Sequence, residues 1–446
     1  MRDRLAMSDR EQVPDRDSST GAVASGSVDT RRLRVALLSY RSKVHSGGQG
    51  VYIRHLSREL AALGHDVEVI SGPPYPELDP GPRLTRLPSL DLYREPDPFR
   101  IPHWREFRSA IDILEFAMMC TASFPEPLTF SLRSWRVLVN RPRASWPDIV
   151  HDNQTLGYGM LLTRKAGLPV VATVHHPIAV DRRLELAAAT LRKQIPIRRW
   201  YSFLRMQGRV ARRLPAVLTV SQSSRADIIT SFDVRADRMT VVPLGVAHDV
   251  FVPPSQPRVP GRIVATASAD VPLKGLVPLL EATASLRADR PVELVVVGTV
   301  REGGATAAAI ERLGLTASVR FVADLSEADL VALFQSAQVA VVPSLYEGFS
   351  LPAVEVMACA TPLVATTAGA LPEVVGPDGE AALHVPPGDP AALAAAIGRV
   401  LDDDDLAGRL GAAGRARVLQ RYTWRVVAER TAAWYHACLA EGGVTC

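Results

Sequence analysis

The stretch AQVAVVPSLYEGFSLPAVEVMACA, residues 337–360, decides the fold that the sequence predicts. Its first part, AQVAVVPS, is a short apolar run typical of a buried strand, and its last part, AVEVMACA, favours a helix. The turn between them carries Glu347, and Glu355 falls one turn into the predicted helix. A strand that runs through a polar turn into a helix is typical of a parallel α/β sheet.

The same alternation of strand and helix occurs along the rest of the chain. Near the N-terminus, RLRVALLSY predicts a strand, RSKVHSGGQG a glycine-rich loop, VYIRHLSRELAALG an amphipathic helix and HDVEVIS a second strand. After a long insertion at about 73–145, further strands are predicted at DIVHDN, PVVATVHH, AVLTVSQ and MTVVPLGV. A second series contains GRIVATAS, a helix from Gly275, VELVVVG, SVRFVA, QVAVVPS and TPLVATT. The sequence therefore predicts two doubly wound α/β halves.

The composition of individual segments suggests where these halves begin and end. A chain of 446 residues suits two domains, and the segment FVPPSQPRVPG interrupts the pattern with four prolines. We expect an N-terminal domain at 32–250, a linker at 251–261 and a C-terminal domain at 262–420. Residues 1–31 are rich in Asp, Arg, Ser and Gly and predict a disordered tail. Residues 421–446 predict a helix that crosses back to the N-terminal domain.

Bulk properties narrow the class of protein. No apolar run reaches the roughly 18 to 20 residues of a membrane span, and the charged N-terminus lacks the apolar core of a signal peptide. The four cysteines follow no metal-ligand or disulfide pattern. The net charge of +4 comes with both signs interspersed, so it does not favour nucleic-acid binding. These features predict a cytoplasmic protein without a bound metal or cofactor.

The turn at 343–352 is a candidate phosphate site. The backbone N–H groups from Phe349 to Leu351 would lie at the start of the following helix, where free N–H groups and the helix dipole favour a phosphate. Glu355 could then reach a ribose diol, and Glu347 could accept hydrogen bonds from sugar hydroxyls. The alternative is that Glu347 is a solvated loop acid and Glu355 a first-turn acid that interacts with the dipole.

Lys274 is a second candidate for contact with a phosphate. Only four of the 51 basic residues are lysine, and Lys274 stands before Gly275 at a predicted junction of strand and helix. From that position a single ammonium group can reach a phosphate as a point charge. The alternative, an ordinary surface lysine, is less consistent with a chain that uses arginine almost everywhere else.

The N-terminal half contributes glycines and histidines. Gly47 and Gly48 would let the backbone approach a ligand closely. They do not complete a dinucleotide fingerprint, because position 53 is Ile and no acid ends the second strand, so a dehydrogenase is the weakest hypothesis. His175 and His176 lie at the end of a predicted strand without a third ligand at metal spacing, and they support a site role but no metal.

With these residues the chain resembles the retaining glycosyltransferases of family 4, which have the GT-B fold of two facing Rossmann-like domains. The resemblance extends from about Arg34 to Leu439. It is most specific where Glu347 and Glu355 match the E-x7-E motif and LKG matches the lysine and glycine element. It implies a nucleotide diphosphate sugar as donor and a hydroxyl acceptor in a glycan, a lipid or a small molecule.

The resemblance also implies roles for individual residues. Glu355 would bind the donor ribose, Glu347 the donor sugar and Lys274 the diphosphate. His175 would lie next to the donor sugar. The backbone contacts to sugar and diphosphate, and the loop that closes over the phosphates, would come from Gly348, Phe349, Ser350 and Leu351 and from Gly47 and Gly48.

Two departures from the family pattern concern charge and polarity. Family members usually have an arginine shortly before the phosphate lysine, whereas this chain has Ser268 and Ala269. Leu244 stands where the family commonly has asparagine. The charge on a bound diphosphate would therefore be neutralised by Lys274 and another group.

The function predicted by the resemblance is metal-independent transfer of a hexose from a donor such as GDP-mannose, UDP-glucose or UDP-GlcNAc. Charge develops on the departing diphosphate, and Lys274 with the helix-end N–H groups would stabilise it there. The acceptor hydroxyl would attack from the face that the diphosphate leaves. A glycoside phosphorylase on the same fold and a catalytically silent sugar-nucleotide-binding module remain alternatives.

Residues 192–213 carry a cluster of positive charge. They contain eight basic residues and no acid, interleaved with apolar and aromatic residues. One interpretation is a peripheral contact with the inner face of the membrane through a basic amphipathic helix. The other is a helix whose apolar face packs on the domain core and whose basic face is solvated.

Overall fold

The protein is described here by a computed structural model. Its described residues are 31–42, 48–175, 178, 182, 185–186, 189–267 and 271–440. Several sequence predictions lie outside them: the tail at 1–30, Gly47, His176, Ser268, Ala269 and the last residues, 441–446.

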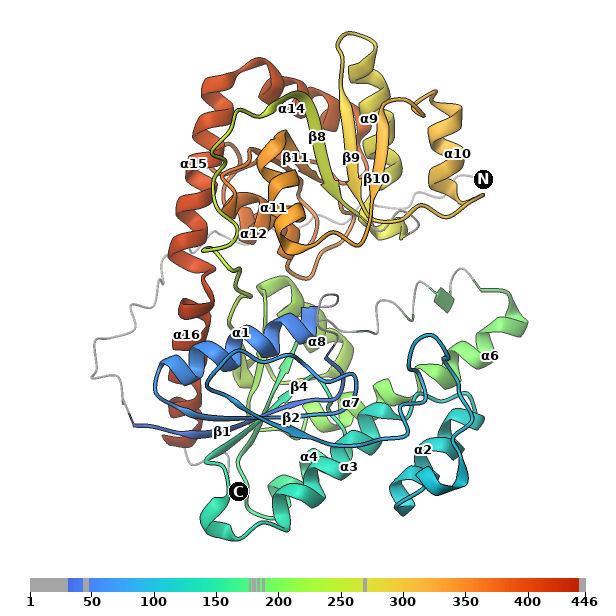
Figure 1. Ribbon diagram of the computed structural model, residues 1–446, viewed down its shortest axis with the longest axis vertical. Helices are drawn as coiled ribbons and strands as arrows, with labels where there is room; N and C mark the ends of the chain where they lie inside the picture. Colours follow the sequence, from blue (N-terminus) through green and yellow to red (C-terminus); the bar gives the residue numbers. More distant parts are fainter. Residues whose placement is uncertain are drawn as a thin grey trace, which may run out of the picture. The chain divides into compact units, whose positions relative to one another are not determined.

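The first half of the chain builds a parallel sheet of seven strands (Figure 1). Their order is β3-β2-β1-β4-β5-β6-β7, and every neighbouring pair is parallel. The order reverses direction between β1 and β4, and in open parallel sheets ligands bind beyond the strand ends at such a point. The strands are β1 (Arg34–Ser39), β2 (Asp66–Ser71), β3 (Arg83–Arg86), β4 (Ile149–Asn153), β5 (Val170–Val174), β6 (Val217–Thr219) and β7 (Met239–Val241).

Helices cover both faces of this sheet. On one face, Val35 and Leu37 of β1 belong to a core cluster with α1, while the alternate residues Ala36 and Leu38 pack with α3, α4 and α7. The helices of this half are α1 (Gly48–Ala62), α2 (Ala110–Cys120), α3 (Glu126–Val139), α4 (Tyr158–Lys165), α6 (Leu191–Trp200), α7 (Phe203–Ala211) and α8 (Gln222–Phe232).

The second half builds a parallel sheet of six strands in the order β10-β9-β8-β11-β12-β13. Its order reverses between β8 and β11, which gives this sheet a switch point of its own. The strands are β8 (Val259–Thr266), β9 (Glu293–Val297), β10 (Val319–Val322), β11 (Ala337–Val342), β12 (Leu363–Thr366) and β13 (Leu383–Val385).

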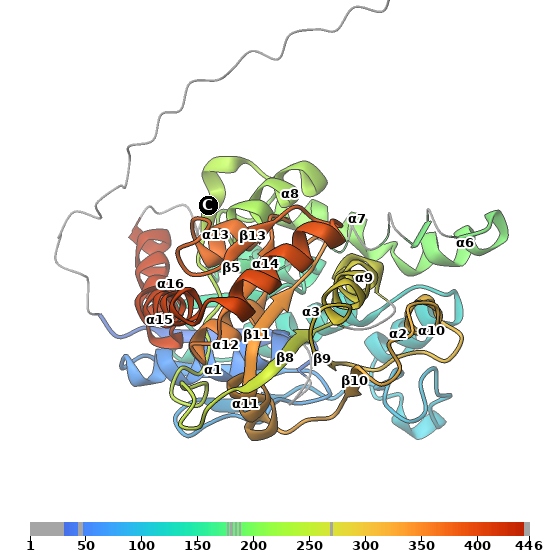
Figure 2. The same ribbon diagram turned by 90° about the horizontal axis from the view of Figure 1, so that it is seen from above.

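Helices also cover both faces of the second sheet (Figure 2). Ile263 and Ala265 of β8 pack with α9 and α14, whereas Val264 between them packs with α11 and α12. The helices of this half are α9 (Leu276–Arg287), α10 (Ala305–Arg312), α11 (Glu327–Ser336), α12 (Leu351–Ala358), α13 (Leu371–Val375), α14 (Pro390–Asp402), α15 (Asp404–Arg421) and α16 (Trp424–Ala440).

The α/β fold class with two doubly wound sheets is confirmed. Three details differ from the sequence prediction. Strand β3 lies inside the long insertion, and the short strand β13 was not predicted. Helix α1 begins at Gly48, so Gly48 belongs to the first helical turn instead of the loop predicted before Val51. The predicted domain boundaries stay predictions.

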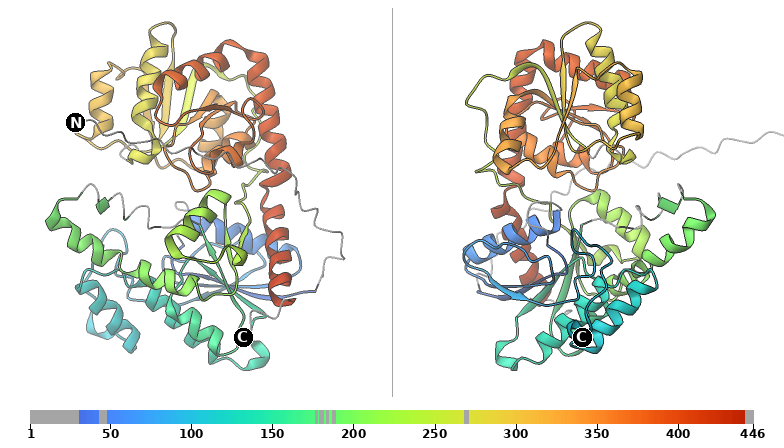
Figure 3. Two further views of the ribbon diagram at one scale, coloured as in Figure 1. Left: turned by 180° about the vertical axis from the view of Figure 1, so that it is seen from behind. Right: turned by 45° about the vertical axis from the view of Figure 1, so that its right-hand side comes forward.

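The last helix, α16, packs against α1 of the first half (Figures 1 and 3). Trp424 at its start stacks on His55 of α1, with ring centroids 5.1 Å apart. A Cβ atom at Gly245 would lie 2.6 Å from the Trp424 ring, so only glycine lets the chain pass this close. Further along α16, the Tyr435 hydroxyl lies 2.5 Å from Nδ1 of His151 on β4.

The basic segment at 192–213 forms α6 and α7, with a break at Tyr201 and Ser202. Its apolar side chains Phe203, Leu204 and Met206 are buried in the core, and the arginine side chains of the segment are exposed. This matches the interpretation with a buried apolar face, and membrane contact stays a prediction. Among the described residues, no helix combines the length and apolar character that crossing a bilayer requires.

Candidate functional site

The loop after β11, residues 343–350, is held by hydrogen bonds to the following elements. Thr366 Oγ1 at the end of β12 donates to the Ser344 carbonyl at 2.5 Å. The Ala370 N–H donates to the Glu347 carbonyl at 2.9 Å. The backbone of the loop is therefore fixed at the carboxyl end of the second sheet, where its side chains can be positioned for a ligand.

Lys274 lies against this loop because of the residue that follows it. Gly275 has φ of +64°, and a Cβ atom there would lie 1.9 Å from the Pro343 carbonyl oxygen. Just beyond, the Leu345 N–H donates to the Leu273 carbonyl at 2.7 Å. Glycine at this position thus allows the segment that carries Lys274 to pack directly on the loop that carries Glu347.

The side chains of Lys274 and Glu347 form an ion pair. Lys274 Nζ lies 2.8 Å from Glu347 Oε1, and Ser344 Oγ donates to the same oxygen at 2.7 Å. Glu347 is buried, whereas the lysine side chain is partly exposed. Glu347 Oε2 has no hydrogen-bond partner among the described residues. The ammonium group has three N–H donors, so it retains donors for a second anion while it holds Glu347.

Helix α12 begins with free backbone donors. In the part of the chain that the structure describes, the N–H groups of Phe349, Ser350 and Leu351 have no hydrogen-bond acceptor. Ser350 adopts φ of +83° at the N-cap, an unusual conformation for a residue with a side chain, and its Oγ is buried without a partner. Phe349 is buried edge-on against Tyr422, with ring centroids 5.8 Å apart. This packing anchors the turn while its N–H groups stay available.

Glu355 lies on the next turn of α12 and is partly buried. Burial, together with a smaller effect of the Glu327 carboxylate, raises its pKa to about 7. No side chain or backbone group among the described residues pairs with this carboxylate. A carboxylate that is desolvated and unpaired gains the most from hydroxyl donors of a ligand.

The carbonyl of Gly348 accepts hydrogen bonds from two serines of the first half of the chain. Ser221 Oγ donates to it at 2.6 Å and Ser224 Oγ at 2.9 Å. Nearby, the Glu373 carboxylate accepts hydrogen bonds from the N–H groups of residues 222–223 at the start of α8. These contacts fix the loop from the other side, and sequence reasoning did not identify the residues that make them.

His175 follows β5 and is held by residues at the end of β4. Its Nε2 donates to Asn153 Oδ1 at 2.6 Å, and its N–H donates to Gln154 Oε1 at 2.7 Å. The Tyr52 ring packs edge-on against the imidazole, with centroids 4.6 Å apart. Burial lowers the pKa of His175 to about 4. The imidazole is therefore neutral near pH 7, with Nδ1 as its free hydrogen-bond acceptor.

A buried polar network lies behind His175. His151 Nε2 lies 2.6 Å from Thr173 Oγ1, which in turn lies 3.3 Å from the Tyr52 hydroxyl. Burial lowers the pKa of His151 to about 3. The run of polar residues at 151–155, which begins within β4 and continues beyond its end, is the sequence feature that could have revealed this network.

The structure brings Lys274, Glu347 and the turn at 348–351 together, and it places Glu355 one turn further along α12. Leu244 is buried in the core and offers no polar group. No cluster of three or more His, Cys, Asp or Glu side chains suited to a metal ion occurs among the described residues.

Comparison with known proteins covers most of the chain. Residues 46–250 match the family described as Glycosyltransferase Family 4, and residues 253–417 match Glycosyl transferases group 1. The MMP alpha-(1->4)-mannosyltransferase of Mycolicibacterium hassiacum is 56% identical over 410 residues, which cover 92% of this chain and 99% of that protein.

Solved structures show the same fold. Sucrose-phosphate synthase from Thermosynechococcus elongatus is similar with a TM-score of 0.64 at 24% identity, covering 92% of this chain and 100% of that chain. The Anabaena protein HepE, crystallised with UDP and glucose, gives a TM-score of 0.65 at 16% identity, covering 91% of this chain and 100% of that chain. These proteins have the GT-B architecture, so the two sheets described above are the two halves of a GT-B fold.

Proposed function

The chain belongs to the group 1, family 4 glycosyltransferases, and on that premise we propose that it transfers mannose from a nucleotide diphosphate mannose, such as GDP-mannose, to a glycan hydroxyl. The choice of mannose and of an α-(1→4) bond rests on the name of the relative that is 56% identical. The proposed reaction retains the configuration of the anomeric carbon and needs no metal ion.

One observation carries the donor half of this proposal: Lys274 lies 2.8 Å from Glu347 on the loop that leads into α12. The ammonium group and the free N–H groups at the start of α12 would receive the two phosphates. Such fixed donors stabilise negative charge without rearranging when it develops. Because Ser268 and Ala269 stand in place of the usual arginine, these N–H groups would be the main partners of the diphosphate besides Lys274.

The remaining predicted contacts concern the two sugars of the donor. Glu355 would accept hydrogen bonds from the ribose diol, since its carboxylate has no other partner among the described residues. Glu347 Oε2 would accept from a hydroxyl of the transferred mannose while Oε1 keeps Lys274 and Ser344. His175 is neutral and would accept a mannose hydroxyl hydrogen through Nδ1.

The chemical step follows from these positions. The bond between the anomeric carbon and the phosphate oxygen breaks, and its electron pair stays on the diphosphate held by Lys274. Positive charge develops at the anomeric carbon, in an oxocarbenium-like transition state. The acceptor oxygen forms the new bond from the face that the diphosphate leaves, and its proton passes to a phosphate oxygen. Gly47, together with Gly48 at the first turn of α1, would belong to the segment that closes over the phosphates and limits hydrolysis.

The proposal can be tested with the purified chain and an α-mannoside acceptor. We expect transfer from GDP-mannose and slower or no transfer from UDP-glucose and UDP-GlcNAc, with an α-linked product identified by NMR. Parallel reactions with orthophosphate and no nucleotide test the phosphorylase alternative. The proposal fails if no mannose nucleotide supports transfer. Donor binding without turnover against any mannoside would favour the silent binding module instead.

A further inference from the structure

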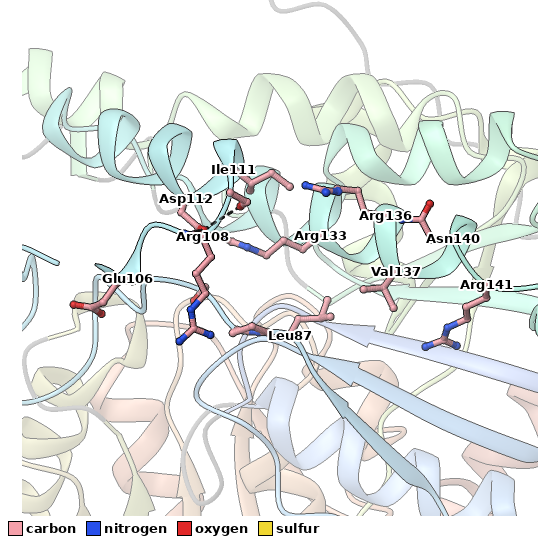
Figure 4. A pocket seen from close by; sticks show the side chains of 13 residues that line it. Leu87, Glu106, Arg108, Ile111, Asp112, Arg133, Arg136, Val137, Asn140 and Arg141 are labelled. Atoms are coloured by element: carbon pink, nitrogen blue, oxygen red, sulfur yellow. Dashed lines mark hydrogen bonds and ion pairs between the residues drawn. The ribbon is translucent and has the colours of Figure 1, made fainter. Parts of the chain in front are cut away.

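A cavity of about 650 Å³ lies in the long insertion of the first half (Figure 4), and none of its lining residues belongs to the candidate site. It is bounded by the loop after β3, the start of α2 and one side of α3. Its volume falls within the range of pockets that hold small molecules. The cavity is therefore large enough for a ligand distinct from the proposed donor.

Part of the cavity wall is apolar. Leu87 after β3, Ile111 on α2 and Val137 on α3 face it from its three sides (Figure 4). Leu87 is buried, and the other two are partly exposed at the cavity. An aliphatic segment of a ligand would bury this surface and gain roughly 25 cal/mol for each Å² removed from water.

The carboxylates that line the cavity form ion pairs with arginines. Asp112 lies 2.6 Å from a guanidinium nitrogen of Arg133, which also pairs with Glu115. Glu106 pairs with Arg100 at 2.5 Å. Glu106 and Asp112, the two acids of the lining, therefore each contact an arginine, and Asp112 shares Arg133 with Glu115. Burial raises the pKa of Glu115, which disfavours its negative charge.

Two arginines at the cavity differ from the others. Arg108 and Arg136 line it, and neither guanidinium has a hydrogen-bond or ion-pair partner among the described residues. In Figure 4 they come from different elements, Arg108 from the segment before α2 and Arg136 from α3. Arg141, which also lines the cavity, is held by two hydrogen bonds to Glu68. The uncompensated positive charge thus comes from Arg108 and Arg136.

We infer that this cavity binds an amphipathic anion: a carboxylate or phosphate monoester attached to an aliphatic body. The anionic group would pair with Arg136, while Arg108, which points in another direction (Figure 4), would add positive charge to the cavity. The aliphatic body would lie against Leu87, Ile111 and Val137. Guanidinium groups suit both anions, because their planar N–H donors match two oxygens at once. The inference depends on the cavity alone and not on the proposed transfer reaction.

Calorimetric titration of the full chain tests this chemistry. The probes are decanoate, decyl phosphate, decanol and inorganic phosphate. We expect decanoate, decyl phosphate or both to bind at least about tenfold more tightly than decanol, and the preferred probe identifies the anionic group. Equal affinity for decanol would overturn the role of charge. Inorganic phosphate that binds as tightly as decyl phosphate would overturn the role of the apolar wall, and no binding of either anion would overturn the whole inference.

Variants assign the binding to this cavity. Arg136→Gln should weaken binding of the preferred anion about tenfold, the loss expected for one charged hydrogen-bond partner. Arg143→Gln is the matched control, because Arg143 follows α3, lies outside the cavity lining and packs on Trp146. An equal loss in both variants would show that the anion binds by general surface charge and would refute the site. Thermal unfolding of both variants confirms that they fold.

Discussion

The carboxyl ends of the two sheets carry opposite kinds of polar group. At the first sheet, His151 and His175 are neutral near pH 7, because burial lowers the pKa of both imidazoles. At the second sheet, Lys274 and Glu347 form a charged pair, and Glu355 titrates near neutrality. The first half is therefore suited to orienting a ligand through hydrogen bonds, and the second half is suited to binding the charged groups of a ligand.

This division fits the chemistry of the proposed reaction. A departing diphosphate accumulates negative charge and needs cations and N–H donors. Sugar hydroxyls, in contrast, can be oriented by a neutral acceptor such as the imidazole of His175 as well as by a carboxylate. Changes at the second sheet should therefore act mainly on the leaving group. Substitutions at the first sheet should disturb the orientation of the donor sugar, and they should lower the rate less.

The largest effect is expected for Lys274→Ala, which removes the cation of the second sheet. Loss of one preorganised charge contact should lower kcat/KM by about 100- to 1000-fold. Lys165→Ala, at the exposed end of α4, is the matched control and should leave the rate unchanged. Unchanged kinetics in a folded Lys274→Ala variant would contradict the hypothesis that the second half stabilises the charge of the departing diphosphate.

A smaller effect is expected for His175→Ala at the first sheet. Loss of one neutral hydrogen bond to the donor sugar should lower kcat roughly tenfold and leave the affinity for the free nucleotide unchanged. His103→Ala, at an exposed position of the same half, serves as the control. Because His175 stays neutral down to about pH 4, the wild-type rate should show no histidine inflection near pH 6.5. If the wild-type rate showed an inflection near pH 6.5 that disappeared in His175→Ala, the conclusion that His175 is neutral near pH 7 would be wrong.

A pH dependence is expected from Glu355. The ribose hydroxyls need the carboxylate form, and with a pKa of about 7 this form is lost as the pH falls. Nucleotide affinity should thus be constant well above pH 7 and decrease below it by at most about tenfold per pH unit.

Two variants isolate this titration. Glu355→Gln should bind nucleotide more weakly and show no pH dependence. Glu327→Gln removes the neighbouring negative charge, which lowers the pKa of Glu355, so the loss of affinity should move to lower pH. Calorimetry between pH 6 and 8.5 measures both, and an identical pH profile in wild type and Glu355→Gln would exclude Glu355 as the titrating group.

The smallest effect on transfer is expected for Tyr435→Phe. The variant leaves His151 Nδ1 buried without its partner, and we expect a loss of about 1 kcal/mol in unfolding free energy with little change in rate. Tyr158→Phe, which loses an exposed contact to Arg209, is the control. Equal melting temperatures for wild type and Tyr435→Phe would show that the neutral network contributes nothing to stability.

Much of the fold could be predicted because its signals are local. The stretch at 337–360 contains its own strand, turn and helix, and each is determined mainly by neighbouring residues. Strand β3 was missed since its sequence, RLTR, begins and ends with a charge and lies at the sheet edge, where solvent tolerates charge. The start of α1 was placed too late because glycines favour a loop, although Gly48 and Gly50 are helical here.

The candidate site was predictable only in part. The scarcity of lysine singled out Lys274, but its ion pair with Glu347 joins residues 73 positions apart, and no local pattern reveals it. The buried network behind His175 depends on Gln207 of α7, which donates to backbone carbonyls at the end of β4, and on Tyr435 of α16. Such contacts appear only when the whole chain is folded.

The contact between Tyr435 and His151 has a consequence for biosynthesis. A ribosome makes β4 long before it makes α16, so the first sheet emerges with Nδ1 of His151 unpaired and part of the surface of α1 uncovered. That half can reach its final state only after α16 has been synthesised and has packed against α1. A nascent chain stalled before Trp424 should therefore be recognised by chaperones or proteases, so that chains without α16 do not accumulate.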